Sequence, residues 1–181
     1  MPDPDAVRRI ADRYRLEPLP VEGGLFRQTW AGPPGPDGRP CGTAIMVLLT
    51  SADGDFSALH RLPTDEVWHF YRGDPLELLL LAPDGSDRLV RLGDFDGGGP
   101  VQFTVPAGTW MGAKVARGGE WALFGTTMAP GFEPADYEGG DADELCRRYP
   151  GRAGRIRELC RPGGPLRMTA ENEGGANHGD A

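Results

Sequence analysis

The chain has 181 residues, of which 39% are hydrophobic and 25% are charged, and its formal net charge at pH 7 is −8. These values are typical of one soluble globular domain that is long enough to bury a sizeable core. Because a negatively charged protein without a clustered stripe of arginines repels phosphate backbones, the sequence argues against nucleic-acid binding.

Cysteine use and hydropathy set further limits on the class of protein. The three cysteines show no C-x-x-C spacing, which argues against a disulfide framework and against a structural zinc site. No apolar run approaches the roughly 20 residues that span a membrane, and the charged N-terminus lacks the apolar stretch of a signal peptide. We therefore expect a cytoplasmic protein without a membrane partner.

The first predicted element is a helix over Asp5–Leu16, in which Val7, Ile10, Ala11 and Tyr14 form one apolar face at helical spacing. After two prolines that end this helix, the pattern changes to short apolar runs divided by Gly, Pro and Asp. These runs are LFRQTW, TAIMVLLT, FSALH, EVWHFYR, LELLLLA, DRLVRL, VQFTVP, MGAKVA and EWALFGTTMA. Their close spacing predicts an antiparallel sandwich or barrel.

Three other segments differ in composition from these runs. The Pro/Gly-rich segment 31–42 predicts a mobile loop. Helical patterns return around 142–149 and 154–160. From Pro162 the chain is rich in Gly, Asn and Glu and poor in apolar residues, which predicts a disordered tail over 162–181 after a single domain over 1–161.

The hairpin LHRLPTDEVWHFYRGDP, which begins at Leu59, holds two of the three histidines. Alternate residues of a small barrel point into its interior, so His60 and Glu66 would face a common cavity from adjacent strands. His69 would then point away from that cavity unless a bulge reverses it. The predicted cavity has apolar walls formed by Leu62, Trp68 and Phe70.

The same hairpin resembles a known motif. His60-x-Leu62-x-x-x-Glu66, with Gly73 seven residues after the glutamate, resembles the first cupin motif, His-x-His-x(3–4)-Glu-x(6)-Gly. The step VPAG and its flanks resemble the second motif, Gly-x(5)-Pro-x-Gly-x-x-His, with Met111 at the histidine position. Two of the four usual metal ligands are thus present, and Leu62 and Met111 replace the other two.

Longer stretches resemble one branch, the fifth cupin subfamily. These stretches are EGGLFRQTW, TAIMVLL, SALHRLPTDEVWHFYRGDPLELLLL, VPAGTWMGA, WALFGTTMAPGFEPADYE and LCRRYP. The resemblance runs from about Leu16 to Cys160. It implies an all-β cupin jelly-roll β-barrel with a short N-terminal helix and short C-terminal helices, usually a homodimer, with structural kinship to sugar-nucleotide 3,5-epimerases.

Our first functional hypothesis is an enzyme that acts on a small polar metabolite, sugar-like or carboxylate-bearing, in the barrel cavity. Its chemistry would be of isomerase, epimerase, cyclase or lyase type, with His60 and Glu66 as the acid–base pair and Arg27 holding an anionic group. We expect no cofactor, because two inward ligands hold a divalent cation weakly. The other predicted substrate contacts are Leu62, Trp68, His69, Phe70 and Met111.

Two alternatives remain open from the residues. One is a non-catalytic module that binds a metabolite in the same cavity. The other is a metal-dependent oxygenase or isomerase, in which His69 or a water joins His60 and Glu66 to complete the ligand shell.

We predict a homodimer, because the runs LELLLL and TAIMVLL are more apolar than strands with one solvated face require. Small barrels often protect such strands by pairing with a second copy. Light scattering at micromolar concentration should give twice the mass of one chain, and a monomeric mass would refute this prediction.

Overall fold

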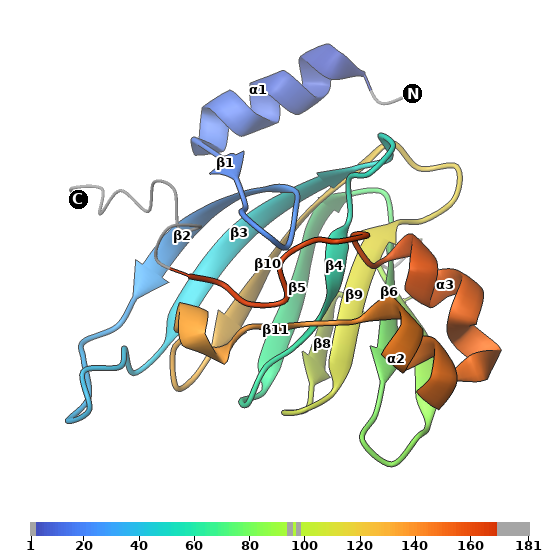
Figure 1. Ribbon diagram of the computed structural model, residues 1–181. Coiled ribbons are helices and arrows are strands. Elements are labelled where there is room, and N and C mark those ends of the chain that lie inside the picture. The colour runs from blue at the N-terminus through green and yellow to red at the C-terminus, as the bar shows by residue number, and fades with distance from the viewer. Residues whose placement is uncertain (1–2, 94–95, 97–98, 170–181) are drawn as a thin grey trace.

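The computed structural model describes residues 3–93, 96 and 99–169, which form two antiparallel sheets that face each other (Figure 1). One sheet has six strands in the order β1-β2-β3-β10-β5-β8, and the other has five in the order β11-β4-β9-β6-β7. In chain order the strands are β1 (Glu17–Pro18), β2 (Leu25–Ala31), β3 (Thr43–Thr50), β4 (Ser57–Arg61), β5 (Glu66–Gly73), β6 (Leu76–Leu81), β7 (Asp87–Leu92), β8 (Gln102–Val105), β9 (Trp110–Val115), β10 (Trp121–Met128) and β11 (Glu138–Gly139).

Each apolar run of the sequence supplies one of the strands β2 to β10, so the all-β jelly-roll prediction is confirmed. The short strands β1 and β11 were not predicted. The predicted barrel is not closed, because no ladder between described strands joins the two sheets.

The helices are α1 (Pro4–Tyr14), α2 (Ala142–Arg148) and α3 (Ala153–Glu158), and two 3-10 turns cover Pro134–Asp136 and Pro150–Arg152. Asp3 caps α1 by accepting a hydrogen bond from the backbone N–H of Asp5 at 3.0 Å. None of the described helices is long and apolar enough to cross a membrane.

The main core fills the space between the sheets. At its centre the ring of Trp68 stacks on that of Phe124, with 5.0 Å between the ring centroids and an angle of 4° between the planes. Period-two alternation along β5 buries Glu66, Trp68 and Phe70 on the inner face and leaves His69 on the outer one. The side chains of β5 that were predicted to point inward are therefore the ones that do so in the structure.

Helices of the same chain cover apolar parts of both outer sheet faces (Figure 1). On the five-stranded sheet, Leu79 and Leu81 of β6 pack against α2 and α3. On the six-stranded sheet, Met46 and Leu48 of β3 pack against α1. The apolar character of LELLLL and TAIMVLL is thus explained within one chain. The homodimer remains a prediction, now without this support.

The first part of the predicted disordered tail has a defined position. The backbone N–H of Gly139 donates to the carbonyl of Leu166 at 2.9 Å, and Glu138 pairs with Arg167 in an isolated antiparallel bridge. Leu166 and Arg167 therefore lie beside β11, whereas 170–181 lie outside the described residues.

Candidate functional site

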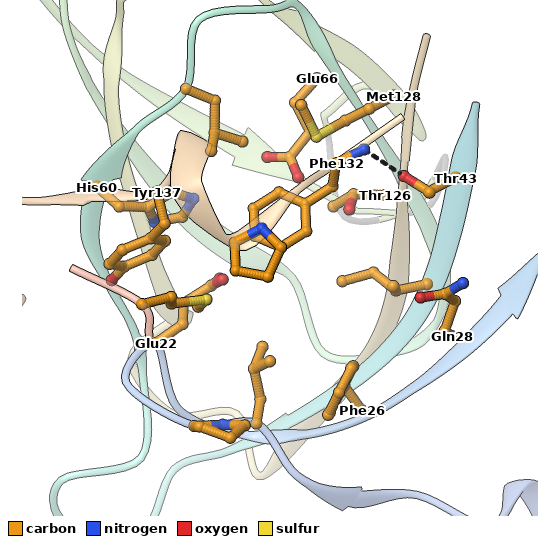
Figure 2. Close-up of a pocket in the computed structure, with 16 residues that line it drawn as sticks. Glu22, Phe26, Gln28, Thr43, His60, Glu66, Thr126, Met128, Phe132 and Tyr137 are labelled. Atoms are coloured by element: carbon orange, nitrogen blue, oxygen red, sulfur yellow. Dashed lines mark hydrogen bonds between the residues drawn. The ribbon is translucent and has the colours of Figure 1, made fainter. Parts of the chain in front are cut away.

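A cavity of about 310 Å³ lies between the two sheets, and side chains from both sheets and from nearby loops line it. Figure 2 shows its polar groups converging from several segments of the chain. The lining residues are Leu19, Pro20, Glu22, Phe26, Gln28, Thr43, Ile45, His60, Leu62, Glu66, Thr126, Met128, Phe132, Pro134, Tyr137 and Met168.

His60 enters this cavity from β4 and is 2% exposed. Its Nδ1 lies 2.7 Å from the carbonyl oxygen of Ala58, and because a carbonyl only accepts, Nδ1 carries the proton of that hydrogen bond. The neutral ring therefore keeps an unprotonated Nε2, which no described residue binds. The ring also stacks on Tyr137, with 5.1 Å between centroids, which fixes its plane.

Glu66 begins β5 and is 6% exposed. One carboxyl oxygen, Oε2, accepts a hydrogen bond from the indole N–H of Trp68 at 2.8 Å. Burial raises the pKa of Glu66 to about 7, against the opposing effect of the nearby His60. Near neutral pH this carboxyl therefore exists in both its acidic and its ionised form, which suits a group that donates and accepts protons.

Several polar residues of the cavity were not predicted from the sequence, and Glu22 and Tyr137 are the ionisable ones among them. The Oε1 atom of Glu22 accepts a hydrogen bond from the hydroxyl of Ser57 at 2.6 Å. Tyr137 is 1% exposed, and burial raises the pKa of its hydroxyl. Neither residue lies in a predicted strand, so alternation could not assign it. The available signal was that both belong to the stretches that resemble the cupin subfamily.

The loop that carries Glu22 has an unusual backbone. Gly23 and Gly24 have positive φ angles of 107° and 81°, a region that glycine adopts readily. A side chain at Gly23 would also collide with its surroundings, because its Cβ would lie 2.5 Å from the carbonyl oxygen of Phe56. The backbone N–H of Ala58 donates to the carbonyl of Glu22 at 2.9 Å and joins this loop to β4. These features place the Glu22 side chain at the cavity.

Two residues predicted to bind substrate lie on the outer face of their sheet. Arg27 stands between Phe26 and Gln28, which line the cavity, so alternation turns it away. His69 Nδ1 accepts a hydrogen bond from the side-chain amide of Gln102 at 3.0 Å, and Nε2 lies 3.0 Å from the hydroxyl of Thr127. Both are corrections to the predicted substrate contacts.

Three further predicted contacts belong to the apolar core. Trp68, Phe70 and Met111 are buried in the cluster between the sheets and do not line the cavity. Met111 pairs with His60 across β9 and β4, so it lies beside the site without reaching it. Of the predicted residues, the cavity brings together His60, Leu62 and Glu66.

The residues at the cupin ligand positions do not fit a metal ion. Leu62 has no donor atom, and Met111 offers a buried thioether, which hard and borderline cations bind poorly. His69, the alternative third ligand, faces away from the cavity. In the described part of the chain, no three His, Cys, Asp or Glu residues are grouped so that they could hold a metal. We therefore derive the chemistry of this site from its own acid–base groups.

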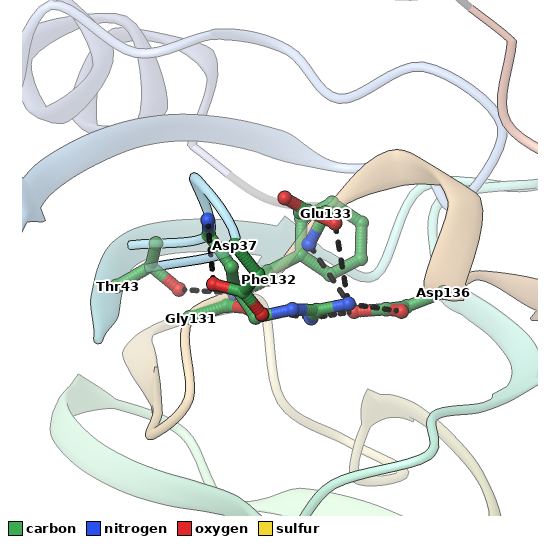
Figure 3. Close-up of polar contacts among 7 residues, drawn as sticks. Asp37, Thr43, Gly131, Phe132, Glu133 and Asp136 are labelled. Atoms are coloured by element: carbon green, nitrogen blue, oxygen red, sulfur yellow. Dashed lines mark hydrogen bonds and ion pairs between the residues drawn. The ribbon is translucent and has the colours of Figure 1, made fainter. Parts of the chain in front are cut away.

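An ion-paired segment borders the cavity (Figure 3). It follows β10 and supplies Phe132 and Pro134 to the cavity wall. The guanidinium of Arg39, from the loop between β2 and β3, donates to both carboxylate oxygens of Asp136 and to the carbonyl of Gly131. It also lies 3.2 Å from Glu133. The predicted mobile loop over 31–42 is thus attached to the segment that closes one side of the cavity.

Two facing antiparallel sheets in jelly-roll order, with a histidine and a glutamate on consecutive strands at one cavity, define a cupin-type protein. The chain belongs to the family described as Cupin superfamily (DUF985), whose model Cupin_5 matches residues 8–139.

Solved structures with the same fold include two that match this chain over most of its length. A protein from Shewanella oneidensis is 30% identical, with a TM-score of 0.77, and the match covers 90% of this chain and 99% of that one. A hypothetical protein from Leishmania major is 28% identical, with a TM-score of 0.76 and coverage of 86% and 98%. Oxalate decarboxylase from Bacillus subtilis is 14% identical, with a TM-score of 0.53 and coverage of 84% and 38%, so that likeness concerns the fold alone. No curated protein matches the chain.

The wild-type protein should lose stability as the pH rises towards neutrality, and the variant Glu66→Gln should not. Because burial raises the pKa of Glu66 from 4.5 to about 7, the folded protein binds more protons than the unfolded chain between these values. The stability that the neutral carboxyl contributes is therefore fully present below pH 4.5. It is lost as the pH rises through about 7. Relative to the wild type, the variant should gain on the order of 1–3 kcal/mol across this range, measured by urea unfolding.

The variant His60→Asn provides a matched comparison for this test. His60 lowers the pKa of Glu66, so without it the loss of stability should move to higher pH. If the free energies of unfolding of the wild type and of Glu66→Gln differ by the same amount at every pH, Glu66 does not titrate in this range.

Replacing Arg39 with glutamine should destabilise the protein by about 1–3 kcal/mol, because the buried carboxylate of Asp136 loses its bidentate partner. The control is Arg152→Gln, which removes an ion pair between Arg152 and the more exposed Asp87 and should cost less than about 1 kcal/mol. Urea unfolding of both variants measures the difference. Equal losses would show that the Arg39 contacts add nothing beyond a surface ion pair.

Proposed function

We propose that this protein is an enzyme that moves protons on a small molecule without a metal ion, in a reaction of isomerase, epimerase, cyclase or lyase type. The observation that carries the proposal is the pairing of two groups at one cavity. The hydrogen bond from Nδ1 of His60 to the Ala58 carbonyl leaves Nε2 as the ring atom that can exchange a proton, and burial raises the pKa of Glu66 to about 7. Groups that titrate near the working pH are the efficient general acids and bases.

His60 serves as the base in this proposal. Its Nε2 takes a proton from the substrate, and the imidazolium that forms keeps its Nδ1–H bonded to the carbonyl of Ala58. This hydrogen bond strengthens as the ring becomes charged, because charge-assisted hydrogen bonds are the stronger ones. The stacked ring of Tyr137 holds the imidazole in one plane, so the base meets the substrate in a fixed orientation.

Glu66 serves as the acid. In its protonated form it donates to a substrate oxygen on which negative charge develops, and the indole N–H of Trp68 holds one of its oxygens in place. The apolar part of the cavity wall, which includes Leu62, Ile45 and Met128, limits competing water and strengthens these interactions.

The proposal predicts that His60→Asn and Glu66→Gln each lower activity by roughly 10²-fold or more, the usual contribution of a positioned acid or base. The matched control is His69→Asn, which should stay close to wild type because His69 lies on the outer face, bonded to Thr127 and Gln102. Activity is first sought by nuclear magnetic resonance, with mixtures of small metabolites in D₂O, as exchange of carbon-bound protons or as isomer formation.

Two outcomes would contradict this function. A metabolite that binds tightly but is neither exchanged nor converted, with unchanged affinity in His60→Asn, would identify a binding module. Activity that disappears on treatment with a chelator and returns with a divalent cation would identify a metal-dependent enzyme.

A further inference from the structure

The charged groups that line the cavity are acidic apart from one imidazole. Glu22 and Glu66 supply carboxyl groups and His60 supplies the imidazole, whereas none of the lining residues is a lysine or an arginine. An anionic ligand would therefore meet two carboxyl groups, against which the lining offers a single imidazole, and such an arrangement disfavours it. The expected carboxylate-bearing substrate does not suit this lining, and Arg27, which was to bind its anionic group, faces away.

The Glu22 carboxylate lacks a cationic partner among the described residues. No Lys, Arg or His side chain in that part of the chain lies within ion-pair distance of it. Arg161 binds the carbonyl oxygen of Glu22 at 3.3 Å instead, and its guanidinium stacks on the ring of Phe56. The hydroxyl of Ser57 donates to one carboxylate oxygen, which leaves the other for a group in the cavity. A carboxylate that is partly removed from water gains most from a positive partner.

Two polar groups on buried side chains beside Glu22 are also without partners among the described residues. Tyr137 is 1% exposed and His60 is 2% exposed, yet no described residue bonds to the Tyr137 hydroxyl or to Nε2 of His60. Both side chains line the cavity, and Tyr137 also borders a smaller pocket beside Cys160 and Arg161. Figure 2 shows Glu22, Tyr137 and His60 on one side of the cavity and Phe26 and Phe132 at other points of its wall. Aromatic ring faces attract cations.

Glu22 also acts electrostatically on its neighbours. Its negative charge raises the pKa of both Glu66 and Tyr137, which places it within electrostatic reach of both groups.

We infer that the ligand of this cavity carries a positively charged nitrogen, as in a protonated amine, and that Glu22 binds it. This inference rests on the proposed function, since it assigns the chemical class of the substrate on which His60 and Glu66 act. Glu22 is then the residue that determines specificity. The rest of the ligand is small and partly apolar, as the volume and the lining of the cavity require.

Three probes of matched shape test this inference: benzylammonium, benzyl alcohol and benzoate, titrated into the full chain near pH 7 by calorimetry or by nuclear magnetic resonance. We expect benzylammonium to bind roughly tenfold more tightly than benzyl alcohol, and benzoate to bind most weakly. Glu22→Gln should abolish the advantage of the ammonium probe and leave the affinity for benzyl alcohol unchanged. Glutamine still accepts the hydrogen bond from Ser57, so this variant is expected to fold.

The matched control is Glu120→Gln, which removes the same charge from an exposed position outside the cavity and should keep the ammonium preference. The inference is overturned if benzoate or benzyl alcohol binds as tightly as benzylammonium, or if benzylammonium fails to bind below about 10 mM. It is also overturned if Glu66→Gln, but not Glu22→Gln, removes the preference.

Failure of this inference and failure of the proposed function give different results. Turnover of uncharged metabolites without ammonium preference would refute the ligand class and keep the acid–base function. An ammonium preference that depends on Glu22, in a protein that converts no amine, would support the ligand class and refute the acid–base function.

Discussion

Burial of the Glu66 carboxyl between two apolar sheets is the constraint on which the site depends. Glu66 is 6% exposed, and the indole N–H of Trp68 donates a hydrogen bond to one of its carboxyl oxygens. Removing a carboxylate from water is unfavourable unless its charge is compensated, so this group is held near its titration point. The packing of Trp68 on Phe124 fixes the indole that bonds to this carboxyl, which connects Glu66 directly to the main core.

The arrangement of helices explains how so apolar a set of strands is accommodated by one chain. Strand β6 buries leucines on both of its faces, one against the opposite sheet and the other against α2 and α3. Helix α1 does the same for β3. Because these contacts use hydrophobic surface that would otherwise be exposed, high strand hydrophobicity is poor evidence for a second copy of the chain in this fold.

The cavity itself depends on segments between and beyond the long strands. The loop that carries Glu22 follows β1, and Tyr137 lies just before β11, more than a hundred positions further along the chain. Thr43 accepts a hydrogen bond from the backbone N–H of Phe132 at 2.9 Å, and Arg39 binds Asp136, so the wall beyond β10 is attached to β3 and to its preceding loop. The strands thus hold His60 and Glu66, the proposed acid–base pair, whereas the loops supply the proposed ligand selectivity.

The sequence by itself determined the nine long strands and the relative orientation of His60, Glu66 and His69. Side-chain alternation is a local property of extended backbone, so it can be read wherever a strand is recognised. Only the tertiary structure decided which inward residues reach the cavity. Trp68 and Met111 share the interior with Glu66 and His60, yet packing against the opposite sheet encloses them in the core. Glu22 and Tyr137 join the site through contacts between segments far apart in the chain, which no local periodicity records. The face occupied by Arg27 was equally undetermined, because alternation gives two faces and only packing identifies the inner one.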